Sequence, residues 1–272
     1  IRAFLEIYEE NFEGLGFDGV FLDKIRYGSF SNGLGGVFSC FCPACRKRYR
    51  EYGIDVDELK HQMGLVREGA GGYGEHVLGI TAYDWGNYTF LHPVWEPFYR
   101  KKAEDIAGAL KPVTRYFRQR GMKVGMDTFA PYLAYFAGQD MKLLASMADF
   151  IKPMMYRITH APAGMPFETD CLSRETVQGN GMQMEGDAKT RARNAFFEIL
   201  GCHDTGTGAF DLNFTARGLT YIAGLGVPVY CGIEVNSNEA APSNPGYLRE
   251  TMEGLRLLDM EGYVLSWDLM CA

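Results

Sequence analysis

The chain has 272 residues, of which 47% are hydrophobic, 14% aromatic and 22% charged, and this composition suits one large globular domain over residues 1–272. Its net charge of −7 and isoelectric point near 5.3 disfavour nucleic acid and anionic membranes as partners, because phosphate groups are bound by clustered Lys and Arg. No window approaches the roughly 18 uncharged apolar residues of a membrane-spanning helix, so the sequence predicts none.

The N-terminal residues and the cysteines bear on the cellular compartment. The sequence begins Ile-Arg-Ala-Phe-Leu-Glu, which lacks the layout of a secretion signal. Seven cysteines are an odd number for a disulfide framework, and three of them crowd into one short segment. Both observations favour a reducing, cytoplasmic location, while the oligomeric state stays open.

The chain begins with a predicted helix over residues 1–15, which glycines end before the first strand. That strand lies in residues 16–27, Gly-Phe-Asp-Gly-Val-Phe-Leu-Asp-Lys-Ile-Arg-Tyr, where a short apolar run leads directly into Asp23, Lys24 and Arg26. In a parallel sheet, charged residues in this position lie at the carboxyl end of the strand, where active sites form.

Residues 28–66 form a cysteine-containing insertion after this strand. The spacing Cys40-x-Cys42-x-x-Cys45 is too tight for a typical disulfide framework and suits metal ligands or free thiols. Three interpretations stay open: a structural zinc site, a redox pair, or buried free thiols. Helices are predicted over 43–52 and 55–63, and the Gly-, Tyr- and Trp-rich residues 67–90 are predicted to form a long loop.

The rest of the chain alternates between helices and apolar strands. A long helix is predicted over 93–120, and shorter helices over 141–147, 187–200, 214–223 and 246–258. Strands are predicted over 122–127, 148–156, 226–234 and 262–268, with weaker candidates over 77–81 and 209–213. This order predicts an α/β fold with parallel pairing and right-handed crossovers.

The architecture predicted from these elements is a (β/α)₈ barrel. The sequence lacks the Gly-x-Gly-x-x-Gly signature of dinucleotide-binding sheets, and polar residues follow nearly every strand, as they do at the active end of a barrel. Five clear strand–helix units are counted, so the barrel is expected to be incomplete at the N-terminal side of this chain.

Four carboxylates end predicted strands and are the catalytic candidates: Asp23, Asp127, Glu234 and Asp268. Glycoside hydrolysis needs two carboxyl groups, about 5–5.5 Å apart for retention of configuration and about 6.5–9.5 Å apart for inversion. Each carboxylate alone is equally well explained by a local ion pair or a helix cap. Four at equivalent positions favour a shared site, because burying charges around one site costs stability unless the site uses them.

Other polar and aromatic residues are candidates for substrate binding. Lys152 lies within an apolar strand and is expected to face a carboxylate, with Tyr156 beyond it and His160 in a Gly/Pro loop. The remaining candidates are Arg26, Tyr27, Trp85, Trp267 and Asp268. The tryptophans could stack on sugar rings, although core packing is the more common role of such residues.

Residues 17–27 resemble the fourth-strand signature of barrel glycoside hydrolases, which carries a catalytic carboxylate. Cys40-Phe-Cys-Pro-Ala-Cys45-Arg-Lys-Arg-Tyr is similar to the zinc-cluster segment of the family-42 β-galactosidases, which also follows the fourth strand. Where those enzymes have an Asn-Glu pair, this chain has Lys24 and Ile25 after Asp23. Residues 1–39 contain no cysteine, so a fourth zinc ligand is sought at Cys171, Cys202 or His203.

The resemblance implies a glycoside hydrolase that acts on a carbohydrate and needs no cofactor for catalysis, with a structural zinc at the cysteines. By analogy with such enzymes, Asp23 would be the nucleophile or transition-state stabiliser, and Glu234, ranked slightly ahead of Asp127, would be the acid/base. The first alternative is a noncatalytic carbohydrate-binding barrel. The second is a barrel lyase or aldolase that uses Lys152 as a Schiff-base amine, which requires a lowered lysine pKa.

Overall fold

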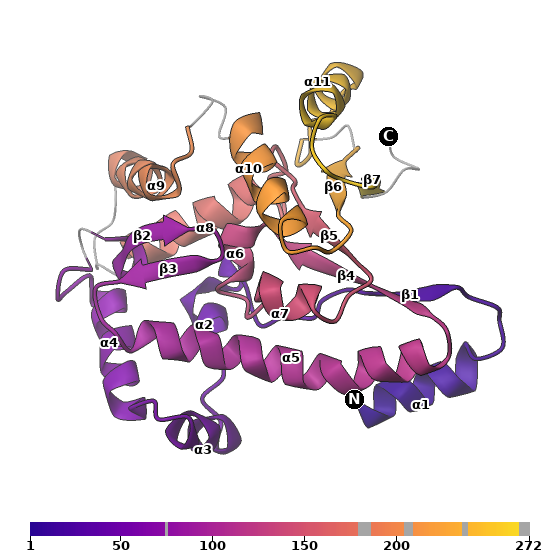
Figure 1. The fold of residues 1–272 in the computed structure, drawn as a ribbon. Helices are drawn as coiled ribbons and strands as arrows, with labels where there is room; N and C mark the ends of the chain where they lie inside the picture. Colours follow the sequence, from indigo (N-terminus) through magenta and orange to yellow (C-terminus); the bar gives the residue numbers. More distant parts are fainter. Residues whose placement is uncertain (74–75, 179–185, 204–208, 236–238, 267–272) are drawn as a thin grey trace.

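The fold is an α/β sheet with one hairpin beside it. A computed structural model describes residues 1–73, 76–178, 186–203, 209–235 and 239–266 (Figure 1). Five strands form one sheet in the order β1-β4-β5-β6-β7, and each neighbouring pair is parallel. They are β1 (Gly19–Leu22), β4 (Lys123–Phe129), β5 (Phe150–Met154), β6 (Tyr230–Glu234) and β7 (Gly262–Ser266). The α/β class and the five predicted parallel strands are confirmed.

The predicted (β/α)₈ barrel is wrong, because the sheet is an open half-barrel whose edge strands β1 and β7 do not pair with each other. The weak candidate at 77–81 lies partly in β2 (Ile80–Asp84), which pairs antiparallel with β3 (Asn87–Phe90) in a separate hairpin. The candidate at 209–213 runs into helix α10 (Leu212–Ala223). Neither segment joins the main sheet, and five strands are too few to close the roughly eight-stranded cylinder of such barrels.

The predicted helices are present with small changes in their bounds. They are α1 (Arg2–Asn11), α3 (Pro43–Glu51), α4 (Val56–Glu68), α5 (Trp95–Gln119), α7 (Met141–Ala145), α9 (Gly186–Leu200), α10 and α11 (Pro245–Leu255). Further helical elements were not predicted: η1 (Phe30–Asn32), α2 (Gly33–Val37), η2 (Val77–Gly79), α6 (Pro131–Ala134) and α8 (Met165–Gln178). In Figure 1, α5 runs the length of the molecule, from the β2-β3 hairpin to α1.

One face of the sheet is covered by helices. Val124, Met126, Ile151, Cys231 and Ile233 are fully buried there, and α5 packs against β4. The same helix holds α1, because the ring of Tyr8 meets the ring of Phe117 edge-on at 4.8 Å between centroids. Apolar residues at alternate strand positions thus fill the layer between sheet and helices.

The opposite face, here called the inner face, changes in character along the strands. Near the amino ends, Phe21 stacks on Phe150 with 5.8 Å between ring centroids, and Phe150 contacts Tyr230 at 5.4 Å. Because side chains alternate along a strand, residues two positions further along share this face. The inner face therefore carries Asp23, Asp127, Lys152, Gly232 and Glu234 toward the carboxyl ends.

No helix in the part of the chain that the structure describes is both long and apolar enough to cross a membrane.

Candidate active site at the carboxyl ends of the strands

The centre of the candidate site is a buried ion pair between β4 and β5. Asp127 and Lys152 stand opposite each other in the strand register, and Lys152 Nζ donates to Asp127 Oδ2 at 2.9 Å and to Oδ1 at 3.2 Å. The same ammonium donates to the hydroxyl of Tyr156 at 2.6 Å. All three side chains are buried, so the pair is shielded from water and its electrostatic interaction is strong.

Burial sets the protonation of this pair. Desolvation raises the pKa of the Asp127 carboxyl to about 6, against the opposing effect of Lys152, and the nearby Asp23 adds to the rise. Burial alone would lower the pKa of Lys152, but Tyr156 and Asp127 outweigh it and the pKa is raised. Lys152 therefore stays a cation, while Asp127 exchanges its proton close to neutral pH.

Asp23 lies beside Asp127 on the next strand. Leu22 pairs with Met126, so the following position in the same register brings the two aspartates side by side on the inner face. Neighbouring strands are about 4.8 Å apart, which is short enough for the charge of Asp23 to act on Asp127. Asp23 is exposed, and its Oδ1 accepts a hydrogen bond from the backbone N–H of Lys24 at 2.6 Å. The site thus pairs one exposed carboxylate with one buried carboxylate.

Gly232 on β6 leaves the space that Lys152 occupies. A Cβ atom at Gly232 would lie 2.6 Å from Lys152 Cε and 2.9 Å from the carbonyl oxygen of Pro153. Because the carbonyl belongs to the backbone of β5, it could not move aside easily. The glycine therefore leaves room for the side chain of Lys152, whose Nζ contacts Asp127.

Glu234 shares the inner face but is enclosed by a loop. Its Oε1 accepts hydrogen bonds from the backbone N–H of Ile158 at 2.9 Å and from the hydroxyl of Thr159 at 3.2 Å. Glu234 is completely buried, and desolvation raises its pKa despite these hydrogen bonds. A carboxyl group covered in this way is less accessible to a substrate than the Asp23 and Asp127 pair.

Three residues around Glu234 were missed in the sequence analysis: Arg157, Thr159 and Tyr247. The guanidinium of Arg157 lies 4.6 Å from the centre of the Tyr247 ring and 3.3 Å from Glu250. Tyr247 lies near enough to lower the pKa of Glu234, although the two side chains are outside ordinary hydrogen-bond geometry. Only the polar residues directly after β5 hinted at this cluster in the sequence.

Arg26 and His160 lie around the site rather than in the ion pair, whereas Tyr27 lies against Lys102 of α5, toward the cysteine cluster. The Arg26 guanidinium is 4.7 Å from the centre of the Phe129 ring, just beyond Asp127 on β4. Tyr27 is half-buried, and burial raises its pKa to about 12. His160 is exposed, with its backbone N–H donating to the carbonyl of Ala240. Among the described residues, no ion pair joins Asp23 to Lys24 or Arg26; Asp23 accepts only from the backbone N–H of Lys24.

The aromatic candidates have different outcomes. Trp85 lies in the turn of the β2-β3 hairpin, where its ring packs on Phe214 of α10 at 5.2 Å and on Tyr83 at 5.4 Å. Trp85 is thus half-buried in an aromatic cluster instead of a free loop. Trp267 and Asp268 lie outside the described residues.

The second candidate site is the cysteine cluster. The sulfur atoms of Cys40, Cys42 and Cys45 all lie within 4.8 Å of one another, so the cluster could bind a metal ion. Cys42 is exposed at the N-cap of α3, whereas Cys45 is buried one turn into the helix. Backbone and side-chain donors at this helix start lower the pKa of the Cys42 thiol to about 7.

The suggested fourth ligands do not reach this cluster. Cys202 Sγ lies 3.3 Å from Asp211 Oδ2, and Cys171 Sγ accepts from Arg174 at 3.3 Å. Neither these cysteines nor His203 join the three clustered sulfurs, and the described residues provide no other Cys, His, Asp or Glu to the group. Within the described residues, a bound metal would therefore have three ligands and one open position.

Comparisons with protein-family models, with curated proteins and with solved structures found no match.

Proposed function

We propose that the chain is a glycoside hydrolase-like enzyme that cleaves a carbohydrate with Asp23 and Asp127 as its two carboxyl groups. The observation that carries the proposal is that Asp23 follows the last paired residue of β1 beside Asp127 on β4 and acts on its charge, with one carboxyl exposed and the other buried with its pKa raised to about 6. The spacing of adjacent strands is of the order of the 5–5.5 Å or so that retaining glycosidases use between carboxyl groups.

The two carboxyl groups take different roles. Asp127 is the general acid that protonates the leaving oxygen, because its pKa of about 6 lets the carboxyl hold a proton at mildly acidic pH, where an ordinary aspartate has lost it. Asp23 is the nucleophile, because it is exposed next to that acid. Lys152 and Tyr156 orient Asp127 through their hydrogen bonds. Glu234, ranked first in the sequence analysis, becomes the second choice for the acid because the loop at 157–160 covers it.

The ion pair counts against a Schiff-base lyase or aldolase. A nucleophilic lysine must be neutral, which requires a lowered pKa. Lys152 is held as a cation by Asp127 and Tyr156, and its pKa is raised.

A panel of aryl glycosides and natural oligosaccharides tests the proposal. With any substrate that the protein turns over, we expect Asp23→Asn to lower kcat by roughly a factor of 10³, because the amide cannot attack the sugar. Asp18→Asn is the matched control, since Asp18 is also exposed and precedes the same strand. Both variants should unfold at the same temperature as the unmodified protein.

Two outcomes would contradict the assignment. Full turnover in the Asp23→Asn variant would remove Asp23 from the mechanism. Sugar binding in calorimetry without product release would instead support the noncatalytic carbohydrate-binding alternative, which needs the same inner face but no acid.

For the cysteine cluster we propose a structural zinc site. Its support is the set of three sulfurs within 4.8 Å of one another, because thiolates are preferred zinc ligands. The site would fasten the chain after β1 to the start of α3. Water or a further thiol would fill the fourth position, which the described residues leave open.

Zinc content after anaerobic purification tests this site. We expect about one zinc ion per chain, falling below about a tenth of that in Cys45→Ser, because loss of one of three protein ligands leaves too few. Cys171→Ser is the control, since Cys171 is equally buried but lies on α8. Equal zinc content in both variants would show that the metal binds elsewhere.

A further inference from the structure

We propose that Cys42 and Cys45 form a thiol–disulfide exchange pair, in which Cys42 attacks a small-molecule disulfide and Cys45 completes the reaction. The segment Cys42-Pro-Ala-Cys45 places the two thiols at either end of the first turn of α3. This activity is separate from the proposed glycoside-cleaving site and does not depend on it.

The two sulfurs differ in access in the way that such a reaction requires. Cys42 is the N-cap residue of α3 and is exposed, so a disulfide in solution can reach its sulfur. Cys45 is only 7% exposed and lies with its sulfur within 4.8 Å of the other clustered sulfurs. The outer thiol, that of Cys42, can therefore react with a substrate in solution. The inner thiol, that of Cys45, can react only with the neighbouring sulfurs.

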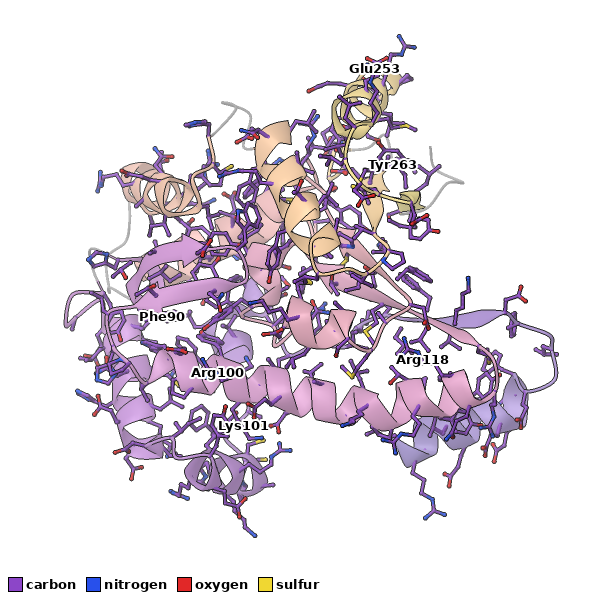
Figure 2. The ribbon with its side chains drawn as sticks, in the orientation of Figure 1. Phe90, Arg100, Lys101, Arg118, Glu253 and Tyr263 are labelled. Carbon is purple, nitrogen blue, oxygen red and sulfur yellow. The ribbon has the colours of Figure 1, made fainter. Side chains whose placement is uncertain are left out.

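The inner thiol is held by a polar chain from α5. Arg48 Nη2 donates to Cys45 Sγ at 3.3 Å and also contacts Asp105 at 3.5 Å. Asp105 is held in turn by Lys101 at 2.7 Å, and Figure 2 shows Lys101 on the side of α5 that faces α3. The guanidinium can stabilise the Cys45 thiolate, the form that attacks in the second step.

The reaction balances in two steps. The thiolate of Cys42 attacks one sulfur of the substrate disulfide, a Cys42–sulfur bond forms, and the other half leaves as a thiolate that takes a proton. Cys45 then attacks the Cys42 sulfur, the intramolecular disulfide forms, and the second half leaves in the same way. The cysteine pair is oxidised by two electrons, and the substrate disulfide is reduced to two thiols.

Zinc and the disulfide would use the same sulfurs, so the exchange belongs to the metal-free, reduced chain. The experiment therefore starts from protein treated with a chelator and dithiothreitol and then desalted without oxygen. Zinc content is measured on a separate sample, so loss of the zinc proposal would not remove this one.

Oxidised glutathione is the probe. The reduced chain is mixed with it, free thiols are blocked with one reagent, disulfides are reduced, and the released thiols are blocked with a second reagent. Cys40, Cys42 and Cys45 all lie within tryptic peptide 27–46, so fragmentation of that peptide by mass spectrometry identifies which two were bridged. We expect Cys42 and Cys45 to carry the second reagent and Cys40 to carry the first.

Variants assign the order of attack. Cys45→Ser should stop at a mixed disulfide of Cys42 with glutathione, and Cys42→Ser should slow consumption of oxidised glutathione by roughly tenfold or more, because the exposed nucleophile is lost. Cys40→Ser is the matched control and should react at the unmodified rate. A bridge that includes Cys40, or a Cys42→Ser variant as fast as the unmodified chain, would overturn the proposal.

Discussion

Asp127→Asn should lower turnover of an accepted glycoside by a factor of roughly 10²–10⁴, because the asparagine amide cannot donate the proton that the leaving oxygen needs. The hydrogen bond from Lys152 can still be made to the amide oxygen, so the fold should be retained. A substrate with a leaving group that needs no protonation should be affected much less.

The pH dependence follows from the raised pKa of Asp127. An acid with a pKa of about 6 is protonated below that pH and loses its proton above it. We therefore expect kcat/KM to fall by about tenfold for each pH unit above this value, as the acid form is depleted.

Glu234→Gln is the comparison that separates the two possible acids. If Asp127 is the acid, Glu234→Gln should keep the high-pH limb of the profile at the same position. If Glu234→Gln instead abolishes the fall in kcat/KM at high pH, and Asp127→Asn turns over normally, then Glu234 is the general acid.

Lys102→Met should change stability by an amount that depends on pH. Lys102 is completely buried on α5, and its Nζ donates to the carbonyls of Val37 at 2.7 Å and Phe136 at 3.0 Å. It thus ties the end of α2 to the turn that follows α6. Leaving these two buried carbonyls without donors should cost about 2–4 kcal/mol at pH 9.

The sign of the pH effect comes from burial, which lowers the pKa of Lys102 from 10.5 to about 7. Between these two pH values the unfolded chain holds a proton on this lysine that the folded chain has lost. Stability therefore rises with pH over this interval, by at most about 1.4 kcal/mol per unit. Below pH 7 the buried amine is charged in the folded state. The cost of burying this charge offsets part of the stabilisation that its two hydrogen bonds provide.

Urea denaturation at pH 6, 8 and 9.5 measures this difference. The gap in unfolding free energy between the unmodified chain and Lys102→Met should widen as the pH rises. Lys111→Met, an exposed lysine on the same helix, should show no such trend. A constant gap for Lys102→Met would mean that the lysine is charged in the fold throughout this range.

The strands were predictable because each is an apolar run that ends in a polar group, as at Val20–Leu22 followed by Asp23. Closure of a barrel was not predictable from such runs. It depends on how many strands join the sheet, and residues 77–90 show the difficulty. Their aromatic and glycine content predicted a loop, yet Trp85 and Gly86 make the turn of a hairpin that packs on α10.

The site was predictable in its residue types but not in its pairing. The Asp127, Lys152 and Tyr156 cluster contains three predicted residues, because Asp127 and Tyr156 end predicted strands and Lys152 is a charged residue within one. The choice between Asp127 and Glu234 depends on the strand register and on the loop that donates to Glu234, which sequence spacing does not reveal. Lys102 was detectable only through its position four residues after Phe98, on the apolar stripe of α5.

The pairing of β1 with β4 has a consequence for how the molecule assembles. Gly19 pairs with Lys123, so roughly a hundred residues of chain separate these strands, whereas Gly125 pairs with the much nearer Phe150. Closing the longer loop costs about 1 kcal/mol more chain entropy than closing the shorter one. Asp23 directly follows β1. The two aspartates therefore come together only when β1 pairs with β4, which closes the longest loop between neighbouring strands of the sheet.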